Sequence, residues 1–358
     1  MDTPSTTTDK TRISRLQEQV KESSLPPDLE EKVTLMLQQA DTALRYGNIA
    51  ALESAERYVS LVVSLPWNKV SVDNLDLASV RKSLDKHHYG MIEVKERIIE
   101  YLSILKLQLQ KAQAEGKSAV EMSRAPIMCF VGLVGTGKTT FAYSIAEAMG
   151  RKIVRIPFGG MGSALELRGQ SRIHPDAEPG HIIKALQRSK TRNPVILLDE
   201  VDRVSEDARN DIMGVLVELL DPEQNVAFTD HFLDYPFNLL NVLFVATANN
   251  TKNITTAVLD RLEPIQMPSY SDNEKISIGR DYILPRQLEN TGLTPQQLVI
   301  DPAVWQKIVR PTGFDAGIRT LERTLNQICR KSARLIIEQK YNTVRVTPEN
   351  ISKFVEMW

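Results

Sequence analysis

The residues Gly132–Thr139 carry the densest chemical signal in the chain, because they have the G-x-x-x-x-G-K-[ST] spacing of a phosphate-binding loop. The glycines of such a loop let successive backbone N–H groups turn inward and bind phosphate oxygens. Lys138 can reach the β- and γ-phosphates of a nucleotide, and the hydroxyl of Thr139 can ligate Mg²⁺. The residues expected to bind the nucleotide are Gly132, Leu133, Val134, Gly135, Thr136, Gly137, Lys138, Thr139 and Thr140.

A pair of carboxylates, Asp199 and Glu200, follows the apolar stretch Val195–Leu198. A continuously apolar strand is buried on both faces, and its carboxyl end opens onto the ligand crevice of a parallel sheet. Asp199 would hold the Mg²⁺ ion there, and Glu200 would polarise the attacking water. The same carboxylates can instead cap the following helix, as Asp202 can. The upstream phosphate loop favours the catalytic interpretation.

Three further polar residues have the order along the chain that ATP hydrolysis between subunits requires. Asn249 ends the next apolar strand and can orient the hydrolytic water. Arg261 precedes the last expected strand and can stabilise the charge that develops on a neighbouring subunit's nucleotide. Arg319 lies near the start of a long helix, from which it can lean over the nucleotide. Taken singly, Asn249 is more often a turn former and Arg261 a surface residue.

The pattern around these residues predicts an α/β fold with a parallel sheet, because short apolar strands alternate with helices from about residue 125 to 268. The expected strands are Ile127–Val131, Ile153–Ile156, Val195–Leu198, Val242–Ala246 and Ile265–Met267. Beyond Ser269 the pattern turns wholly helical, with helices expected at Asp272–Asn290, Pro302–Val309 and Gly317–Gln339.

A helical pattern also precedes the sheet, broken at Pro26-Pro27 and stopped at Pro66-Trp67. A further helix is expected over Asp85–Lys106, with Tyr89-Gly90 at its start, followed by an exposed polar connection over Gln108–Arg124. We therefore predict four parts of the chain. They are a disordered lead (1–10), an N-terminal helical region (11–84), an α/β nucleotide-binding domain (85–268) and a small all-α lid domain (269–358).

Composition limits the classes of partner. The chain has 358 residues, 42% of them hydrophobic, and a net charge of −1, which argues against nucleic acid as an obligate partner. The two cysteines lie in apolar patterns, so neither a disulfide framework nor a zinc site is indicated. No apolar run has the length of a membrane span, and the first residues do not resemble a leader. We expect a soluble, cytoplasmic protein without membrane contact.

These residues together make the chain from about Pro66 to Lys353 resemble the AAA+ ATPase module of Lon-type ATP-dependent proteases. The stretch Asp221–Asn225 is far more specific to that family than the phosphate loop is. Other segments that carry the resemblance are Leu65-Pro66-Trp67-Asn68, His88-Tyr89-Gly90, Arg168-Gly169, Asp230-His231, Phe244–Asn249, Gly317-Ile318-Arg319, Cys329-Arg330-Lys331 and Val346–Asn350.

The resemblance implies ATP and Mg²⁺ as cofactors and gives each site residue a role. Asp199 and Glu200 become the Walker B pair, and Asn249 becomes sensor 1. Arg261 becomes the arginine finger that acts on a neighbour, and Arg319 becomes sensor 2. The segment His88-Tyr89-Gly90 is expected to line the adenine pocket. The family also implies a homo-oligomeric ring, commonly a hexamer, that threads unfolded polypeptide through a central pore.

Two departures from the family pattern leave the biological role open. No segment resembles the proteolytic domain with its Ser-Lys dyad, so proteolysis would need a peptidase outside these residues. The first pore loop carries His174-Pro175-Asp176 where an aromatic–aliphatic pair is usual. We therefore hold three hypotheses: an unfolding and translocating motor for ATP-dependent proteolysis, a protease-free remodelling or scaffolding protein, and a nucleotide-gated assembly module with slow turnover. Glu200, Asn249 and Arg261 argue against the third.

Overall fold

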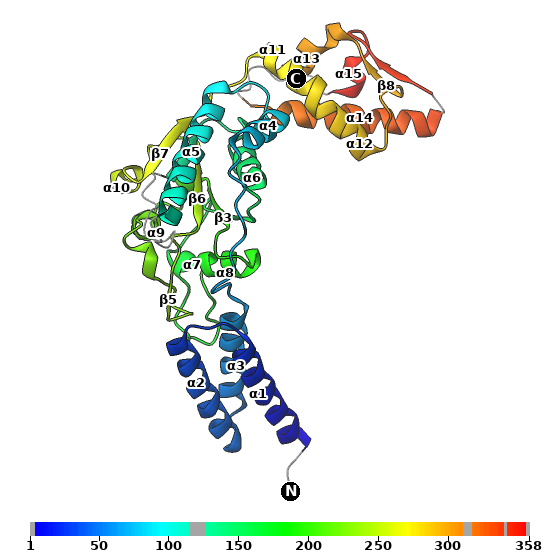
Figure 1. Ribbon diagram of the computed structural model, residues 1–358. Helices are drawn as coiled ribbons and strands as arrows, with labels where there is room; N and C mark the ends of the chain where they lie inside the picture. Colours follow the sequence, from blue (N-terminus) through cyan, green and yellow to red (C-terminus); the bar gives the residue numbers. More distant parts are fainter. Residues whose placement is uncertain (1–3, 115–126, 311–316, 340–341, 356–358) are drawn as a thin grey trace.

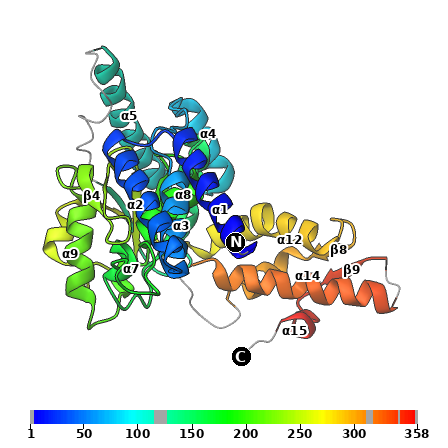
Figure 2. The ribbon, with the colours of Figure 1, turned by 90° about the horizontal axis from the view of Figure 1, so that it is seen from below.

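The computed structural model describes residues 4–114, 127–310, 317–339 and 342–355. The molecule is elongated and bent, with a bundle of helices at the N-terminal end, a sheet domain in the middle and a helical lid at the other end (Figure 1). Seen from below, the lid extends to one side of the sheet domain (Figure 2).

The N-terminal bundle consists of α1 (Pro4–Glu22), α2 (Pro27–Arg45) and α3 (Ile49–Ser64). The predicted break at Pro26-Pro27 is confirmed, because Pro27 occupies the first position of α2, where its missing N–H costs nothing. The expectation of disorder is wrong for residues 4–10, which are helical: Pro4 likewise suits a helix start. Residues 1–3 lie outside the described part of the chain.

The bundle is joined to the sheet domain by aromatic side chains. The ring of Trp67, just after α3, lies 5.0 Å from that of Phe237 and 5.8 Å from that of Tyr235. The hydroxyl of Tyr58, a fully buried residue of α3, donates to the backbone oxygen of Leu233 at 3.0 Å. Large rings with a satisfied polar group make such a junction both apolar and specific.

The predicted parallel sheet is confirmed. Its strands are β1 (Ile127–Val131), β2 (Ile153–Pro157), β3 (Val195–Asp199), β6 (Leu243–Ala248) and β7 (Leu262–Gln266), in the spatial order β2-β3-β6-β1-β7 with every neighbouring pair parallel. The helices between strands are α6 (Lys138–Met149), α7 (Leu165–Arg168), α8 (His181–Ser189), α9 (Arg209–Leu220) and α10 (Thr256–Leu259), with short 3₁₀ turns η2 (Val201–Arg203) and η3 (Asn225–Ala227). A two-residue antiparallel pair, β4 (Phe228–Thr229) with β5 (Pro236–Phe237), was not expected.

Two helices, rather than one, lead into the sheet. They are α4 (Leu77–His87) and α5 (Ile92–Ala114), and they replace the single helix expected over Asp85–Lys106. The chain turns between them because Gly90 and Met91 adopt positive φ values of 61° and 52°. Helix α5 also continues through the first part of the predicted exposed connection; the rest of that connection lies outside the described residues.

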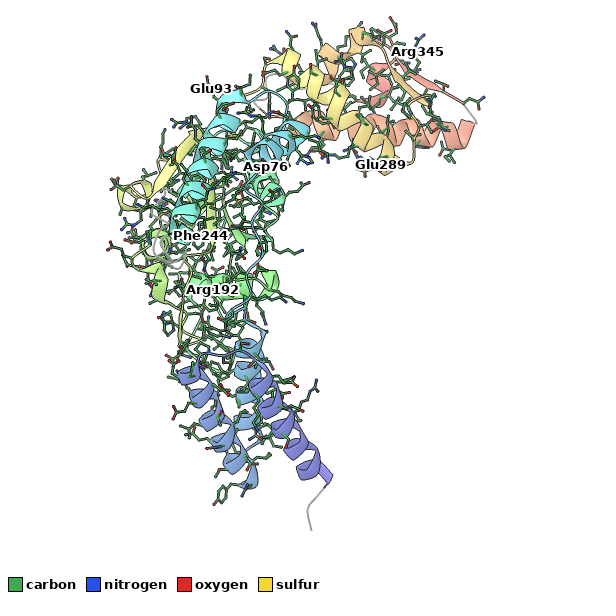
Figure 3. The ribbon with its side chains drawn as sticks, in the orientation of Figure 1. Asp76, Glu93, Arg192, Phe244, Glu289 and Arg345 are labelled. Carbon is green, nitrogen blue, oxygen red and sulfur yellow. The ribbon has the colours of Figure 1, made fainter. Side chains whose placement is uncertain are left out.

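The sheet divides the apolar core in two, because alternate side chains of a strand point to opposite faces. On one face Phe130, Leu197 and Val245 pack with α5 and α6, and this cluster continues into the lid. On the other face Ile196 and Phe244 pack with α8 and α9, and this cluster continues into the N-terminal bundle. Phe244 lies inside the sheet domain, whereas Glu289 and Arg345 mark the lid (Figure 3).

The lid is helical as predicted, with one addition. Its helices are α11 (Asp272–Ile278), the π-helical turn η4 (Gly279–Ile283), α12 (Leu284–Thr291), the 3₁₀ turn η5 (Pro302–Val304), α13 (Trp305–Val309), α14 (Arg319–Gln339) and α15 (Ile351–Phe354). The addition is a parallel pair of short strands, β8 (Leu298–Ile300) and β9 (Val344–Val346). These segments are rich in β-branched residues, which favour strands over helices, so the expectation of a wholly helical lid was too simple.

Gly180, which precedes α8, offers a test of the packing between α7 and α8. A Cβ atom there would lie 2.0 Å from the backbone oxygen of Leu167, and the Gly180 N–H is held at 2.7 Å by Asp230 Oδ2. We expect Gly180→Ala to lower the free energy of unfolding by roughly 1–3 kcal/mol. Urea denaturation followed by circular dichroism measures the change.

Gly214, in the exposed middle of α9, provides the matched control, because a Cβ atom there would meet no atom within 4 Å. Gly214→Ala is expected to raise the free energy of unfolding by about 0.5–1 kcal/mol, since alanine favours a helix. A Gly180→Ala protein as stable as the wild type would show that the space between Gly180 and the backbone of Leu167 can admit a methyl group.

Candidate functional site

The phosphate-binding loop lies between the end of β1 and the start of α6. Gly135 and Gly137 have φ values of 83° and 94°, which favour glycine because a Cβ atom would be strained there. Gly137 is the N-cap of α6, so the first N–H groups of that helix, which lack acceptors within the helix, face the loop. Such an arrangement of N–H groups and a positive helix end binds anions such as phosphate.

Lys138 connects this loop to the end of β6. Its Nζ donates to the backbone oxygens of Gly132 at 2.7 Å and Leu133 at 3.0 Å, and to Asn249 Oδ1 at 3.1 Å. Burial lowers the pKa of Lys138, against the opposing effect of nearby acidic groups such as Asp202. The Nδ2 atom of Asn249 is buried and makes no hydrogen bond within the described part of the chain, so this amide has a donor left for a ligand.

The carboxylate of Asp199 accepts hydrogen bonds from three other side chains of the site. Its Oδ1 accepts hydrogen bonds from the hydroxyls of Thr247 at 2.5 Å and Thr139 at 3.2 Å, and its Oδ2 accepts one from Arg155 Nε at 2.6 Å. The residue is only 4% exposed, so its charge must be balanced by such partners. Thr139 and Asp199 thus present hydroxyl and carboxylate oxygens side by side, a donor set that suits Mg²⁺.

Glu200 follows with a left-handed backbone, at φ 59° and ψ 49°. This conformation is uncommon for a residue with a side chain and often marks functional sites. Its backbone N–H donates to Thr247 Oγ1 at 2.9 Å, and its Oε2 lies 3.6 Å from Arg203 Nη1. The backbone conformation therefore depends on β6 as well as on β3.

One cavity brings most of the predicted site residues together. The lid contributes to it because the N–H of Ile318 donates to the Gly135 oxygen at 3.0 Å. Gly317 permits this approach: a Cβ atom there would lie 2.5 Å from the Val134 oxygen. The cavity is lined by Val134, Gly135, Gly137, Lys138, Thr139, Thr140, Asp199, Glu200, Asn249, Ile318, Arg319 and Glu322.

A second cavity adjoins the first and shares Gly137, Thr140, Ile318 and Glu322 with it. Its other lining residues are largely aromatic or apolar and include His88, Tyr89, Tyr143, Tyr270, Tyr282 and Ile283. The rings of Tyr89 and Tyr282 meet edge to face, with centroids 6.3 Å apart. Aromatic side chains beside a phosphate-binding loop suit a nucleobase. Gly90 is not among the lining residues and instead forms the turn after Tyr89.

His88 is one of the residues that line the second cavity, and most of its side chain is buried. Its ring stacks on Phe141 at a centroid distance of 3.6 Å, and its Nε2 lies 2.9 Å from Ser144 Oγ. Burial, with a smaller effect of the nearby Lys95, lowers the pKa of His88 to about 3. The imidazole is therefore neutral near pH 7 and supports the wall of the cavity.

Arg261 lies apart from both cavities of its own chain. Its Nη2 donates to Asp221 Oδ2 at 2.8 Å and its Nη1 to the Ala257 oxygen at 2.8 Å. This ion pair lowers the pKa of Asp221. The structure thus separates Arg261 from the other predicted site residues, which is compatible with action on a different subunit.

The sequence pattern missed three residues that hold the site in shape. Arg155 and Thr247 bind Asp199 from the strands on either side of β3. Asp202, considered above as a helix cap, accepts the backbone N–H groups of Asn249 at 3.1 Å and Asn250 at 3.3 Å. For Arg155 and Thr247 the sequence did contain a signal. Each is a charged or hydroxyl residue within an otherwise apolar strand, and such a residue needs a polar partner.

Among the described helices, none combines the length and hydrophobicity that a membrane span requires.

Comparison with known proteins agrees with this geometry. Residues 128–270 match the ATPase family associated with various cellular activities (AAA), and residues 289–344 match the Lon protease AAA+ ATPase lid domain. The chain is 40% identical over 343 residues to a Lon protease of Lawsonia intracellularis, covering 96% of this chain and 40% of the relative. It is 40% identical over 331 residues to Lon protease 2 of Thermus thermophilus, covering 92% and 41%. The chain thus spans about two fifths of the length of the curated relatives it matches.

The buried histidine makes the stability of this region depend on pH. Because folding lowers the pKa of His88 from 6.5 to about 3, the unfolded chain binds more protons below pH 6.5 and stability falls as the solution is acidified. We expect His88 to contribute a loss of about 2 kcal/mol in the free energy of unfolding between pH 7.5 and pH 5.0. Urea denaturation at both values, compared with His88→Gln, isolates this contribution. An equal pH dependence in the variant would contradict a neutral, buried His88.

Proposed function

Because the chain contains an AAA ATPase domain followed by a Lon-type lid, we propose that it binds ATP with Mg²⁺ and hydrolyses the nucleotide within a homo-oligomeric ring. The observation that carries this proposal is the single cavity that collects Lys138, Asp199, Glu200, Asn249 and the lid residue Arg319. These side chains come from separate elements of two domains. Their convergence beside a phosphate-binding loop is what phosphoryl transfer requires.

Each residue has a proposed role that follows from its contacts. Lys138 and the loop N–H groups bind the phosphates, and Asn249 directs its free amide donor at the ligand. Thr139 and Asp199 would hold Mg²⁺, which when bound neutralises charge on the phosphates. Glu200 orients and polarises the attacking water. Arg319 contacts the nucleotide from the lid.

The site of one subunit is completed by its neighbour. We propose that Arg261 reaches the nucleotide of the next subunit, because in its own chain it is paired with Asp221 and lies outside the cavity. That ion pair is partly buried, with 28% and 19% of the two side chains exposed. The ion pair holds the guanidinium in a defined position, so less conformational entropy is lost when the neighbouring subunit docks.

The ring would unfold and translocate polypeptide for proteolysis by a peptidase domain. The loop that would contact the polypeptide is residues 170–179. The loop over residues 170–179 has its ends joined, since the Gln170 N–H donates to the Glu178 oxygen at 3.0 Å. Its tip exposes Ile173, of which 89% is accessible, beside His174. An exposed aliphatic side chain can press against a threaded chain, although with less area than an aromatic ring.

The same loop also favours a second candidate function, remodelling or scaffolding of a partner without threading. Arg57 of α3 donates to the Pro175 oxygen at 3.0 Å, and the guanidinium of Arg172 lies 4.0 Å from the centroid of the Tyr58 ring. These contacts tie the loop to the N-terminal bundle. A loop that is anchored in this way moves with the bundle rather than as a separate paddle.

Mixed oligomers test the shared site. Glu200→Gln is expected to keep ATP binding and to lower turnover by roughly 100-fold or more, because water activation is lost. Arg261→Ala is expected to lower turnover similarly. An equal mixture of the two proteins should regain activity, since the intact cavity of one subunit then meets Arg261 of the other. A mixture of Glu200→Gln with Lys138→Ala is the control, because neither subunit offers an intact cavity. Absence of recovery in the first mixture would exclude action in trans.

Unfolding of a fluorescent protein with an unstructured tag separates the two candidate functions. For the threading motor, loss of fluorescence should require ATP, and Ile173→Ser should slow it several-fold with unchanged ATP hydrolysis. Ile337→Ser, which alters an isoleucine in the lid that is 80% exposed, is the matched control and should have no effect. ATP hydrolysis without any unfolding would favour remodelling or scaffolding.

A further inference from the structure

We propose that Thr247 is a positioning residue that fixes both acidic groups of the site at once. This inference rests on the proposed function, because it assigns to Thr247 the placement of Asp199 and Glu200 for Mg²⁺ binding and water activation. Thr247 belongs to β6 and was not among the residues that the sequence pattern singled out.

The hydroxyl of Thr247 has two partners, and their chemistry fixes its orientation. Asp199 Oδ1 lies 2.5 Å away and the backbone nitrogen of Glu200 lies 2.9 Å away. A carboxylate accepts hydrogen bonds and a backbone N–H only donates, so the hydroxyl must donate to Asp199 and accept from Glu200. The short distance to Asp199 is typical of a hydroxyl bonded to a charged carboxylate.

The position of Thr247 explains why it meets both groups. Leu198 pairs with Ala246 in the parallel register of β3 and β6, so Thr247 is beside Asp199 one residue further along. Thr247 is fully buried, and water therefore cannot replace its hydroxyl. Removal of the hydroxyl would leave the Glu200 N–H without this acceptor and Asp199 with one donor fewer.

Asn249, whose amide belongs to the same cavity, follows Thr247 by two residues and lies just beyond the end of β6. Asn249 Oδ1 accepts a hydrogen bond from Lys138 Nζ at 3.1 Å. Glu200 holds a left-handed backbone that is disfavoured for a residue with a side chain, and its N–H bond to Thr247 supports that conformation. A displacement of β6 is thus transmitted to the backbone of Glu200 through one hydrogen bond.

The test compares Thr247→Val with Thr247→Ser in the full chain. Valine keeps the shape and suits a strand but has no hydroxyl, whereas serine keeps the hydroxyl. We expect Thr247→Val to lower kcat for ATP about 10- to 100-fold and to raise the Mg²⁺ concentration needed for half-maximal activity. The KM for ATP should change little, and Thr247→Ser should restore most of kcat. Equal kcat values for wild type and Thr247→Val would overturn the proposal.

Two controls keep the result specific. Thr324→Val removes another buried hydroxyl, which donates to the Thr320 oxygen within α14, and should leave kcat unchanged. If Thr247→Val does not fold, Thr247→Cys replaces it, because a thiol is a weak donor; equal activity of the cysteine and serine variants would then overturn the proposal.

A separate readout distinguishes this inference from the proposed function. The Mg²⁺ dependence of binding of a fluorescent ATP analogue should shift in Thr247→Val whether or not hydrolysis is measured. A wild-type protein that binds the analogue but hydrolyses no ATP would contradict the proposed function only. An unshifted Mg²⁺ dependence together with an unchanged kcat would contradict the role of Thr247 only.

Discussion

The buried carboxylate of Asp199 is the constraint on which the rest of the site depends. An ionised group that is removed from water costs several kcal/mol unless charged or hydroxyl partners compensate it. Those partners come from three other elements: Arg155 from β2, Thr139 from α6 and Thr247 from β6. Satisfying one carboxylate therefore fixes the relative positions of the phosphate-binding loop and the neighbouring strands, which is the preorganisation that phosphate chemistry needs.

The division of the core by the sheet connects this site to the two ends of the molecule. The cluster on the α6 face continues into the lid, and the cluster on the α8 face continues into the N-terminal bundle. Each end is thus continuous with the apolar cluster on one side of the sheet. The lid touches the loop directly, backbone to backbone, between Ile318 and Gly135.

Much of the fold and of the site was predictable because it depends on local pattern. All five strands of the parallel sheet and the phosphate-binding loop were predicted, since apolar runs and glycine spacing are properties of short segments. The predictions failed in several places, of which the pairing of β8 with β9 is a long-range contact. Residues 4–10 are helical, α4 and α5 are separate, and β8 pairs with β9 across the lid. The strand pair joins segments far apart in the sequence, and such a pairing leaves no periodic signal.

The sequence by itself determined which chemistry is present: a loop for phosphate, two carboxylates at a strand end, and an amide and arginines in the order that ATP hydrolysis requires. Only the tertiary structure decided which groups meet. It placed Asn249 against Lys138, set Thr247 between Asp199 and Glu200, stacked His88 on Phe141 at the second cavity, and paired Arg261 with Asp221 outside both cavities. The reason is physical. Residue type and spacing fix what a side chain can do, whereas strand register and packing between distant segments fix what it touches.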